Sequence, residues 1–375
     1  MIEIFFWVCF LLLFYAFIGY PALIWIFART AGQRSRFDER RIPTVSMLLS
    51  VYNEEQVIRS KLENFLQLDY DSQALEMIVV SDGCSDGTEA IVASFDSPRI
   101  RLIVQEERGG KTLALNRAAA EAKGDILVFT DANSMFAPDA LRKLTRHFAD
   151  PEVGLVSGRS VYLDARNNTE HSGGVYRQYE DFIKEQESGT VSIVGADGAI
   201  YALRADLYQP LPAEYINDFI HPLQVVCRGL RAVQESEALC REVQDGDAGK
   251  ELQRQTRIMA QSWLIVFSQA KNLLHAGRVG HFWAMISHKV LRWITLPLMA
   301  ALLFFNLLLL DEGLRYQILF TIQFGFYLAV IAGWRRTEGL LRVPAMFTLL
   351  HAAAVLGLCR LMTGQVFITW DPRKQ

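Results

Sequence analysis

The sequence of 375 residues lacks the patterns that mark several common kinds of site. Its five cysteines include no C-x-x-C pair, so we infer neither a disulfide framework nor a zinc site. Its seven histidines show no H-E-x-x-H or comparable ligand spacing. No G-x-G-x-x-G follows the first predicted strand, so the usual dinucleotide-binding fingerprint is missing. An excess of positive charge is missing too, because the formal net charge is -3, and nucleic acid is not an expected partner.

Apolar residues, by contrast, are abundant and make up 51% of the chain. Residues Ile4–Ala28 carry no charged side chain. Three further apolar segments lie near the other end of the chain, at Trp293–Leu310, Ile318–Trp334 and Val343–Cys359. Each segment is close to the roughly 20 residues that a bilayer-spanning helix needs. We therefore predict an amino-terminal membrane helix over residues 1–28, a membrane region of about three helices over 288–362, and a tail over 363–375.

A cleaved signal peptide is the alternative for the first segment, but the segment is too long and no small-residue cleavage site follows it. Basic residues follow it instead, at Arg29, Arg34, Arg36, Arg40 and Arg41. By the positive-inside rule they place the amino terminus outside and the central region in the cytosol of a cell (inner or plasma) membrane. If every apolar segment crosses the membrane, the tail Asp371–Gln375 ends outside. The tail is basic, so this placement conflicts with the positive-inside rule, and the side on which the tail lies stays open.

The central region, about 230 residues long, is large enough for one substantial α/β domain. Its first part alternates strand and helix patterns. The predicted strands are Thr44–Val51, Glu76–Asp82, Ile100–Gln105 and Asp125–Asp131, and the predicted helices are Glu54–Leu68, Gly87–Phe95 and Lys111–Ala122. Such alternation implies a parallel sheet with right-handed crossovers.

Two of the predicted strands run from apolar residues into an aspartate, Asp82 in "IVVSDGCSDGT" and Asp131 in "ILVFTDAN". The first polar residues after such a run mark the carboxyl end of a buried parallel strand, where ligands bind. In an extended chain, Asp131 and Asn133 would point the same way and offer oxygens to a hard divalent cation. The alternative is a turn that caps the following helix, and the tripeptide alone does not decide between the two.

Five motifs in order then resemble a known family: "YNEE", "SDGCSDGT", "GGKTLALN", "FTDANSMFAPDAL" and "GADGAIYALR". Together they resemble the inverting family 2 glycosyltransferases, whose nucleotide-sugar domain has the GT-A fold, a Rossmann-like, mostly parallel α/β sheet. With flanking transmembrane helices, the chain is similar to the membrane-bound branch that includes hyaluronan, chitin, cellulose and poly-N-acetylglucosamine synthases. The resemblance covers roughly Thr44–Trp263 and implies a cytosolic GT-A domain over residues 42–256.

The resemblance also implies roles for individual residues on the donor side. Asp82 would contact the nucleoside of the donor, with Glu54 nearby, and Lys111 would face the donor phosphates. Asp131 and Asn133 match the D-x-D motif that holds Mg²⁺ or Mn²⁺ on the diphosphate. Asn133 departs from the motif because its side chain is a neutral ligand.

On the acceptor side, the resemblance implies that Gly195, Asp197 and Arg204 bind the acceptor. The stretch "INDF" resembles the family's T-E-D or D-D element, which makes Asp218 the expected catalytic base. A helix cap is the alternative for Asp218. Inverting transfer needs one carboxylate to accept the acceptor's proton, and cations to offset the charge of the leaving diphosphate.

Arg257 is expected to meet the donor diphosphate with its planar guanidinium. Processive members carry Q-x-x-R-W, whereas this chain reads R-Q-T-R-I at Arg254–Ile258, without the tryptophan, which puts a long polymer product in doubt. Residues 257–280 are predicted to form an amphipathic helix at the bilayer interface, with a core helix as the alternative. In the helix Tyr176–Ser188, three side chains are candidates for the acceptor path: Tyr179, Glu180 and Glu187. His221 is interpreted as a packing residue.

The expected function is therefore a membrane-embedded inverting glycosyltransferase that moves a sugar from a nucleotide-sugar, expected to be a UDP-sugar, to a growing polysaccharide or a lipid-linked acceptor. One alternative is transfer of a single sugar to a polyprenyl phosphate or a glycolipid. Another is an inactive nucleotide-sugar-binding partner subunit. The partners implied are the donor, the acceptor, the membrane and subunits of a polysaccharide export system.

Overall fold

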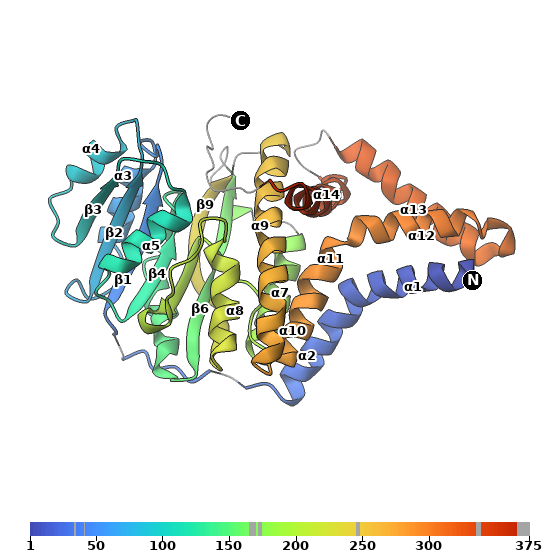
Figure 1. Cartoon of the computed structure of the whole chain (residues 1–375), viewed down its shortest axis with the longest axis horizontal. Coiled ribbons are helices and arrows are strands. Elements are labelled where there is room, and N and C mark those ends of the chain that lie inside the picture. The colour runs from blue at the N-terminus through green and yellow to red at the C-terminus, as the bar shows by residue number, and fades with distance from the viewer. Residues whose placement is uncertain are drawn as a thin grey trace.

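The computed structural model describes residues 1–33, 35–40, 42–164, 170–171, 175–244, 248–334 and 339–365. Arg34 and Arg41 of the orientation signal and the basic end of the tail lie outside the described residues. An α/β domain forms one end of the molecule, and long apolar helices extend from it to the other end (Figure 1).

The first half of the domain is the parallel sheet that the sequence predicts. Its strands are β1 (Val45–Val51), β2 (Leu75–Asp82), β3 (Ile100–Gln105) and β4 (Ile126–Thr130). They lie in the order β3-β2-β1-β4, and all neighbours run parallel. The connecting helices are α3 (Ile58–Leu66), α4 (Thr88–Ala93) and α5 (Lys111–Glu121). The carboxyl ends of β1, β2 and β4 therefore meet at one edge of the sheet.

The second half of the sheet is largely antiparallel and was not predicted from the sequence. Its strands are β5 (Ser134–Phe136), β6 (Val153–Asp164), β7 (Glu170–His171), β8 (Ile200–Arg204) and β9 (Arg231–Gln244). β8 lies between β4 and β6 and runs antiparallel to both, whereas β9 runs parallel to β6 and antiparallel to β5. Short 3₁₀ turns lie at Arg146–Ala149, Ala205–Leu207 and Leu310–Glu312. The sheet is thus mixed, with a Rossmann-like parallel half.

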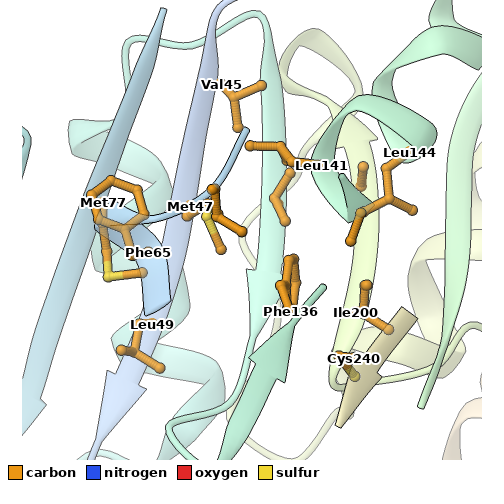
Figure 2. Packing of buried hydrophobic residues seen from close by; sticks show 14 of the residues in the cluster. Val45, Met47, Leu49, Phe65, Met77, Phe136, Leu141, Leu144, Ile200 and Cys240 are labelled. Atoms are coloured by element: carbon orange, nitrogen blue, oxygen red, sulfur yellow. The ribbon is translucent and has the colours of Figure 1, made fainter. Parts of the chain in front are cut away.

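Both faces of the sheet are covered, because successive side chains of a strand point to opposite sides. Met47 and Leu49 of β1 pack with α3 and α6 (Ala140–Thr145) on one face, as Figure 2 shows for this cluster. Leu48 packs with Leu115 of α5 on the other face. Burial on both faces explains why the central strands read as continuous apolar runs.

Two longer helices, α7 (Val175–Ser188) and α8 (Asn217–Cys227), pack on the second half of the sheet, and α9 (Ala248–His275) packs against α8. α9 is one continuous helix of 28 residues. The predicted boundary between a domain ending at 256 and an interface helix over 257–280 therefore falls inside α9, and the predicted ends of that helix are wrong. Its sequence contains no proline that would break it between residues 248 and 275.

The apolar helices come from both ends of the chain. α1 (Ile2–Phe14) continues through a π-helical turn (Tyr15–Gly19) into α2 (Tyr20–Thr30), and together they form a 29-residue candidate span. The later helices are α10 (Val279–Ala284), a π-helical turn at Met285–Val290, α11 (Leu291–Trp293), α12 (Thr295–Leu307), α13 (Leu314–Gly333) and α14 (Arg342–Met362). Among the described residues, three helices are long and apolar enough to cross a membrane, or up to four if the pair bent by 61° between Trp293 and Thr295 is one span.

A shared apolar cluster joins the domain to these helices. Phe219 of α8 and Trp263 of α9 both pack on Trp293 of α11, with ring centroids 5.9 and 4.9 Å apart. The Trp263 indole N–H donates a hydrogen bond to the Ala354 carbonyl of α14, 3.0 Å away. The domain and the apolar helices therefore share one core.

Buried charges lie in the same junction. The Glu187 carboxylate of α7 accepts a hydrogen bond from the Tyr20 hydroxyl (2.6 Å) and lies 2.7 Å from Nδ1 of His288. Glu180 pairs with Lys289 at 3.0 Å and with Arg292. The Tyr179 hydroxyl donates to the Phe17 carbonyl. These contacts hold α7 against the apolar helices and give Tyr179, Glu180 and Glu187 structural partners; their place along an acceptor path stays a prediction.

Candidate active site

The turns that follow β1 and β2 are tied together at the carboxyl edge of the sheet. The Asn53 side-chain oxygen accepts the Ser85 N–H at 2.8 Å, and the Glu54 N–H donates to the Thr88 hydroxyl at 2.8 Å. Arg108 lies over the ring of Tyr52, 3.5 Å from its centroid. Glu54 and the "SDGCSDGT" turn thus form one surface, which Tyr52 and Arg108 extend. Tyr52 opens the "YNEE" motif but had been given no role, and no sequence pattern had marked Arg108.

Asp82 is buried at the end of β2 and supports the loop that leads to Lys111. Its two carboxylate oxygens accept the N–H groups of Gly109 (2.7 Å) and Gly110 (2.8 Å). Gly110 has a φ of 90°, a conformation that favours glycine. The geometry gives Asp82 a positioning role, and its contact with a nucleoside stays a prediction.

Asp131 directly follows β4 and forms an ion pair with Lys111, the first residue of α5. Partial burial opposes the charge of Lys111, but the Asp131 carboxylate outweighs it through its charge and its hydrogen bond and raises the pKa of Lys111. The Ser134 N–H donates to the Asp131 carbonyl at 3.2 Å, so residues 131–134 form a turn. The argument from an extended chain is therefore wrong for Asp131 and Asn133, and Asn133 lies exposed on the turn.

Two buried groups beneath this turn were missed by the sequence analysis. The Lys61 ammonium donates to the Thr130 hydroxyl at 2.7 Å and to the Ser134 carbonyl. Burial lowers the pKa of Lys61 to about 8. Glu242 of β9 accepts a hydrogen bond from the Ser134 hydroxyl. Burial, with Asp197 and Asp131 nearby, raises the pKa of Glu242 to about 7. Lys61 could have been noticed in the sequence, because it is a lysine on the otherwise apolar face of α3.

Asp218 lies in the first turn of α8 and packs against the "GADG" segment. The Ala196 N–H donates to the Asp218 carbonyl at 2.9 Å. A β-carbon on Gly198 would lie 2.7 Å from Oδ2 of Asp218, so a larger residue at this position would force the Asp218 carboxylate to move. Burial raises the pKa of Asp218, while Lys111 lowers it and Asp131 raises it further. The three side chains therefore influence one another across the same cleft.

The predicted acceptor residues divide between the cleft and elsewhere. Gly195 packs against the ring of Phe219, beside Asp218. Asp197 accepts hydrogen bonds from the Ser160 hydroxyl (2.7 Å) and from Arg177 (2.9 Å). Burial favours its neutral form, but Arg177, Lys184 and the hydrogen bonds from Ser160 together lower the pKa of Asp197. Asp197 thus joins β6 to α7 near the cleft, through an arginine that the sequence analysis missed.

Arg204 does not lie in the cleft, and its predicted role in acceptor binding is wrong. Its guanidinium donates to the backbone carbonyls of Val153 (2.7 Å), Phe148 (3.0 Å) and Asp150 (2.9 Å). It is paired with Ile126 at the beginning of β4, whereas Asp131 follows the end of that strand. Arg204 therefore supports the opposite edge of the sheet.

Arg257 approaches the cleft from α9. Burial and the neighbouring Arg254 lower the pKa of Arg257 to about 10, while Asp218 and Asp131 favour its charged form. It therefore stays protonated at neutral pH. The cleft thus gathers two cations, Lys111 and Arg257, around the carboxylates of Asp131 and Asp218.

His221 lies close to Asp218 in the sequence but is not available as a base. Its Nδ1 is 3.0 Å from the Tyr201 hydroxyl, and its ring packs on Phe129. Burial lowers the pKa of His221 to about 3. The interpretation of His221 as a packing residue is consistent with these contacts.

Comparisons with known proteins agree with this geometry. The family model "Glycosyl transferase family 2" matches residues 46–208. Over 182 residues the chain is 28% identical to a beta-monoglucosyldiacylglycerol synthase of Trichormus variabilis, an alignment that covers 48% of this chain and 39% of that protein. Over 116 residues it is 32% identical to the poly-beta-1,6-N-acetyl-D-glucosamine synthase of Staphylococcus aureus, covering 30% of this chain and 28% of that protein. The chain thus spans well under half the length of these curated relatives.

A solved structure extends the fold comparison to almost the whole chain. The mannosyltransferase PcManGT from Pyrobaculum calidifontis, in complex with GDP-Man and Mn2+, superposes with a TM-score of 0.71 at 22% sequence identity. The superposition covers 97% of this chain and 100% of that one. Residues 46–208 therefore form a family 2 glycosyltransferase domain, within a chain that has the GT-A fold and long apolar helices at both ends.

Proposed function

We propose that the protein is a membrane-embedded inverting glycosyltransferase that moves a sugar from a nucleotide-sugar to a glycan or lipid-linked acceptor. One observation carries the proposal. The Lys111–Asp131 pair, at the carboxyl edge of the parallel strands, lies within electrostatic reach of Asp218, which comes from a distant part of the chain. This arrangement supports a diphosphate site beside a general base.

In the proposed reaction, Asp218 accepts the proton of the acceptor hydroxyl. The hydroxyl oxygen forms a bond to the anomeric carbon of the donor sugar while the bond from that carbon to the nucleoside diphosphate breaks, with inversion. The raised pKa of Asp218 makes it a stronger base than an ordinary aspartate. Lys111 and Arg257 offset the charge that develops on the leaving diphosphate.

A divalent cation, Mg²⁺ or Mn²⁺, fits the residues at this site. Among the described residues no three His, Cys, Asp or Glu side chains form a complete metal site. Mg²⁺, however, is commonly held by one or two carboxylates together with substrate phosphates. Asp131, with Asn133 on the same turn, would supply the protein ligands. The bound cation would neutralise charge on the diphosphate, and the Mn2+ beside GDP-Man in the structure of similar fold supports this assignment.

The membrane part of the proposal rests on the apolar helices and the flanking charges. Arg29 lies in the last turn of α2, and Arg36 and Arg40 follow that helix, whereas Asp311 and Glu312 lie between α12 and α13. By the positive-inside rule, the domain faces the cytosol of the cell (inner or plasma) membrane, and the loop between α12 and α13 faces outside. The two relatives are named as synthases of a glucosyldiacylglycerol and of a poly-N-acetylglucosamine. These names support an acceptor that is a lipid or a growing glycan.

Transfer of a single sugar is a second candidate, and α9 carries the observation that favours it. Ile258 stands beside Arg257 where processive relatives carry a tryptophan. The next tryptophan, Trp263, is buried against Trp293 and α14 and has no open face for an acceptor sugar. A lipid-linked acceptor that receives one sugar needs no such stacking platform.

The test is transfer by the purified protein in nanodiscs, with UDP- and GDP-sugars, lipid or glycan acceptors, and Mg²⁺ or Mn²⁺. We expect turnover with one of the donors, and we expect this turnover to require the metal.

Asp218→Asn is expected to reduce kcat by about 10²- to 10⁴-fold without weakening donor binding, because only the base is removed. The matched control is Asp206→Asn at an exposed position. The product mass distinguishes polymer from single transfer. Donor binding without any turnover would favour the inactive partner subunit.

A further inference from the structure

The last apolar helix, α14, is not aligned with the helices that would cross the bilayer. In Figure 1, α1, α12 and α13 extend along the long axis of the molecule, whereas α14 is viewed almost end-on. The amino terminus lies beside the turn between α12 and α13, because the Glu3 carboxylate accepts hydrogen bonds from Arg315 (2.8 Å) and Tyr316 (2.7 Å). That turn and the amino terminus thus mark the end of the helices far from the domain.

α14 packs instead on α9, at the end of the helices that adjoins the domain. A β-carbon on Gly357 would lie 2.7 Å from the Ala260 backbone nitrogen, so the two helices touch backbone to backbone. The Trp263 indole bonds to the Ala354 carbonyl in the same contact. α9 also carries Arg257, which faces the cleft. The contacts with α9 therefore fix the position of α14 next to the domain.

Exposed apolar side chains lie at several points along α14, and both of its ends are basic. Val343, Leu356 and Met362 are 44%, 43% and 79% exposed. Arg342 begins the helix and Arg360 lies in its last turn. A helix lying in the interface buries apolar side chains among the acyl chains and keeps basic groups at the lipid headgroups. Because α14 also packs against α13, the bilayer that surrounds α13 is the occupant that fits these exposed side chains.

We propose that α14 lies along the cytosolic surface of the bilayer and does not cross it, so that α9 and α14 together seat the domain on the membrane. The inference rests on the membrane embedding proposed above. It leaves three crossings, by α1–α2, by α10–α12 and by α13, and it puts the carboxyl-terminal tail on the side of the domain. The basic residues of the tail then obey the positive-inside rule.

The test locates three single cysteines with a membrane-impermeant maleimide. Asp96→Cys reports on the domain, Gly313→Cys on the turn between α12 and α13, and Thr363→Cys on the end of α14. All three positions are accessible. The five native cysteines are replaced by alanine, and intact and permeabilised vesicles are compared. We expect Thr363→Cys to label on the same side as Asp96→Cys and on the opposite side from Gly313→Cys.

The outcomes separate this inference from the proposed function. Labelling of Thr363→Cys on the side of Gly313→Cys would show that α14 crosses the bilayer, which overturns the inference and leaves the proposed function standing. Labelling of Asp96→Cys and Gly313→Cys on one side would overturn the membrane embedding itself. If the cysteine-free protein does not fold, a reporter that is active only in the cytosol is fused to the carboxyl terminus of the unaltered chain. Its activity is the expected result, and its inactivity overturns the inference.

Discussion

Asp218 is subject to opposing influences from the residues around it. Burial and the Asp131 carboxylate raise its pKa, whereas Lys111 and, more weakly, Lys184 lower it. The base form therefore exists only above a pKa that exceeds the ordinary value of 3.8. The ionisation of one side chain thus depends on charges contributed by α5, α7 and the turn after β4.

The pH dependence of transfer follows from this balance. We expect kcat/KM to fall at acid pH along a limb whose midpoint lies above that of an ordinary aspartate, because protonation removes the base. Lys111→Met is expected to move this limb to higher pH, since the variant loses the cation that lowers the pKa of Asp218. Lys184→Met should move it in the same direction by less, and Lys123→Met, outside the cleft, should leave it unchanged. A limb that does not move in Lys111→Met would contradict the coupling.

Lys61 offers a test of how the turn at residues 131–134, the proposed metal site, is held in place. The ammonium is fully buried and bonds to both ends of the turn, at Thr130 and Ser134. Replacing Lys61 by methionine removes these bonds, and we expect the metal concentration needed for half-maximal activity to rise by about 10- to 100-fold, as for other supports of metal ligands. The melting temperature should change little, because a buried charge is replaced by an apolar group of similar length.

The matched control is Arg59→Met, which removes an exposed cation from the same helix. It should leave the metal requirement unchanged. An equal loss of melting temperature and activity in Lys61→Met, with an unaltered metal requirement, would assign Lys61 to stability alone.

Among the helices, the contact between α9 and α14 links the apolar helices to Arg257 and the residues around Asp218. Gly357 allows this contact, because any side chain there meets the backbone of α9. Gly357→Leu is therefore expected to separate the helices and to lower transfer more than donor binding, since Arg257 on α9 would shift relative to Asp218. Gly325→Leu on α13 adds the same side chain where the glycine has open space, and it should have no effect. Parallel transfer and binding assays of the two variants in nanodiscs decide the matter.

The elements show which parts of the fold and site a sequence can reveal. The strands β1 to β4 were predicted almost to the residue, because burial on both faces produces continuous apolar runs between glycine-rich turns. The antiparallel strands were not predicted, because β8 and β9 pair with partners that are distant in the sequence. The ordered motifs marked Lys111 and Asp131, and the separate stretch "INDF" marked Asp218, which the fold brings near them.

The errors have equally local causes. Asp131 and Asn133 were assigned to an extended chain, but the Ser134 N–H closes a turn onto the Asp131 carbonyl. Arg204 ends the last of the five motifs, yet its strand runs antiparallel to β4 and carries it to the far edge of the sheet. Glu242 could not be found from the sequence, since only the pairing of β9 with β5 brings it to Ser134.

On the scale of the whole molecule, the domain and the apolar helices are joined by buried charge as well as by the tryptophan contacts. Glu187 is fully buried and connects Tyr20 of α2 with His288 of the turn before α11. Burial favours its neutral form, but His288 outweighs burial and lowers the pKa of Glu187. A carboxylate thus links three segments that are far apart in the sequence.

Glu187→Ala is expected to lower the free energy of unfolding by about 3–5 kcal/mol, because it leaves the buried partners of the carboxylate without it. Thermal unfolding in detergent, followed by intrinsic tryptophan fluorescence, measures the loss. Glu185→Ala, at an exposed position two residues earlier on the same helix, is the control and should cost less than about 1 kcal/mol. Equal effects of the two substitutions would contradict a structural role for the buried cluster.

Gly198 sits where Oδ2 of Asp218 leaves no room for a β-carbon. The position therefore serves as a sequence marker. In other chains of this fold, alanine or any larger residue at the equivalent site indicates that the aspartate has been displaced, even where every donor-side motif is intact. A single methyl group at this position is thus expected to shift the carboxylate that we propose as the base.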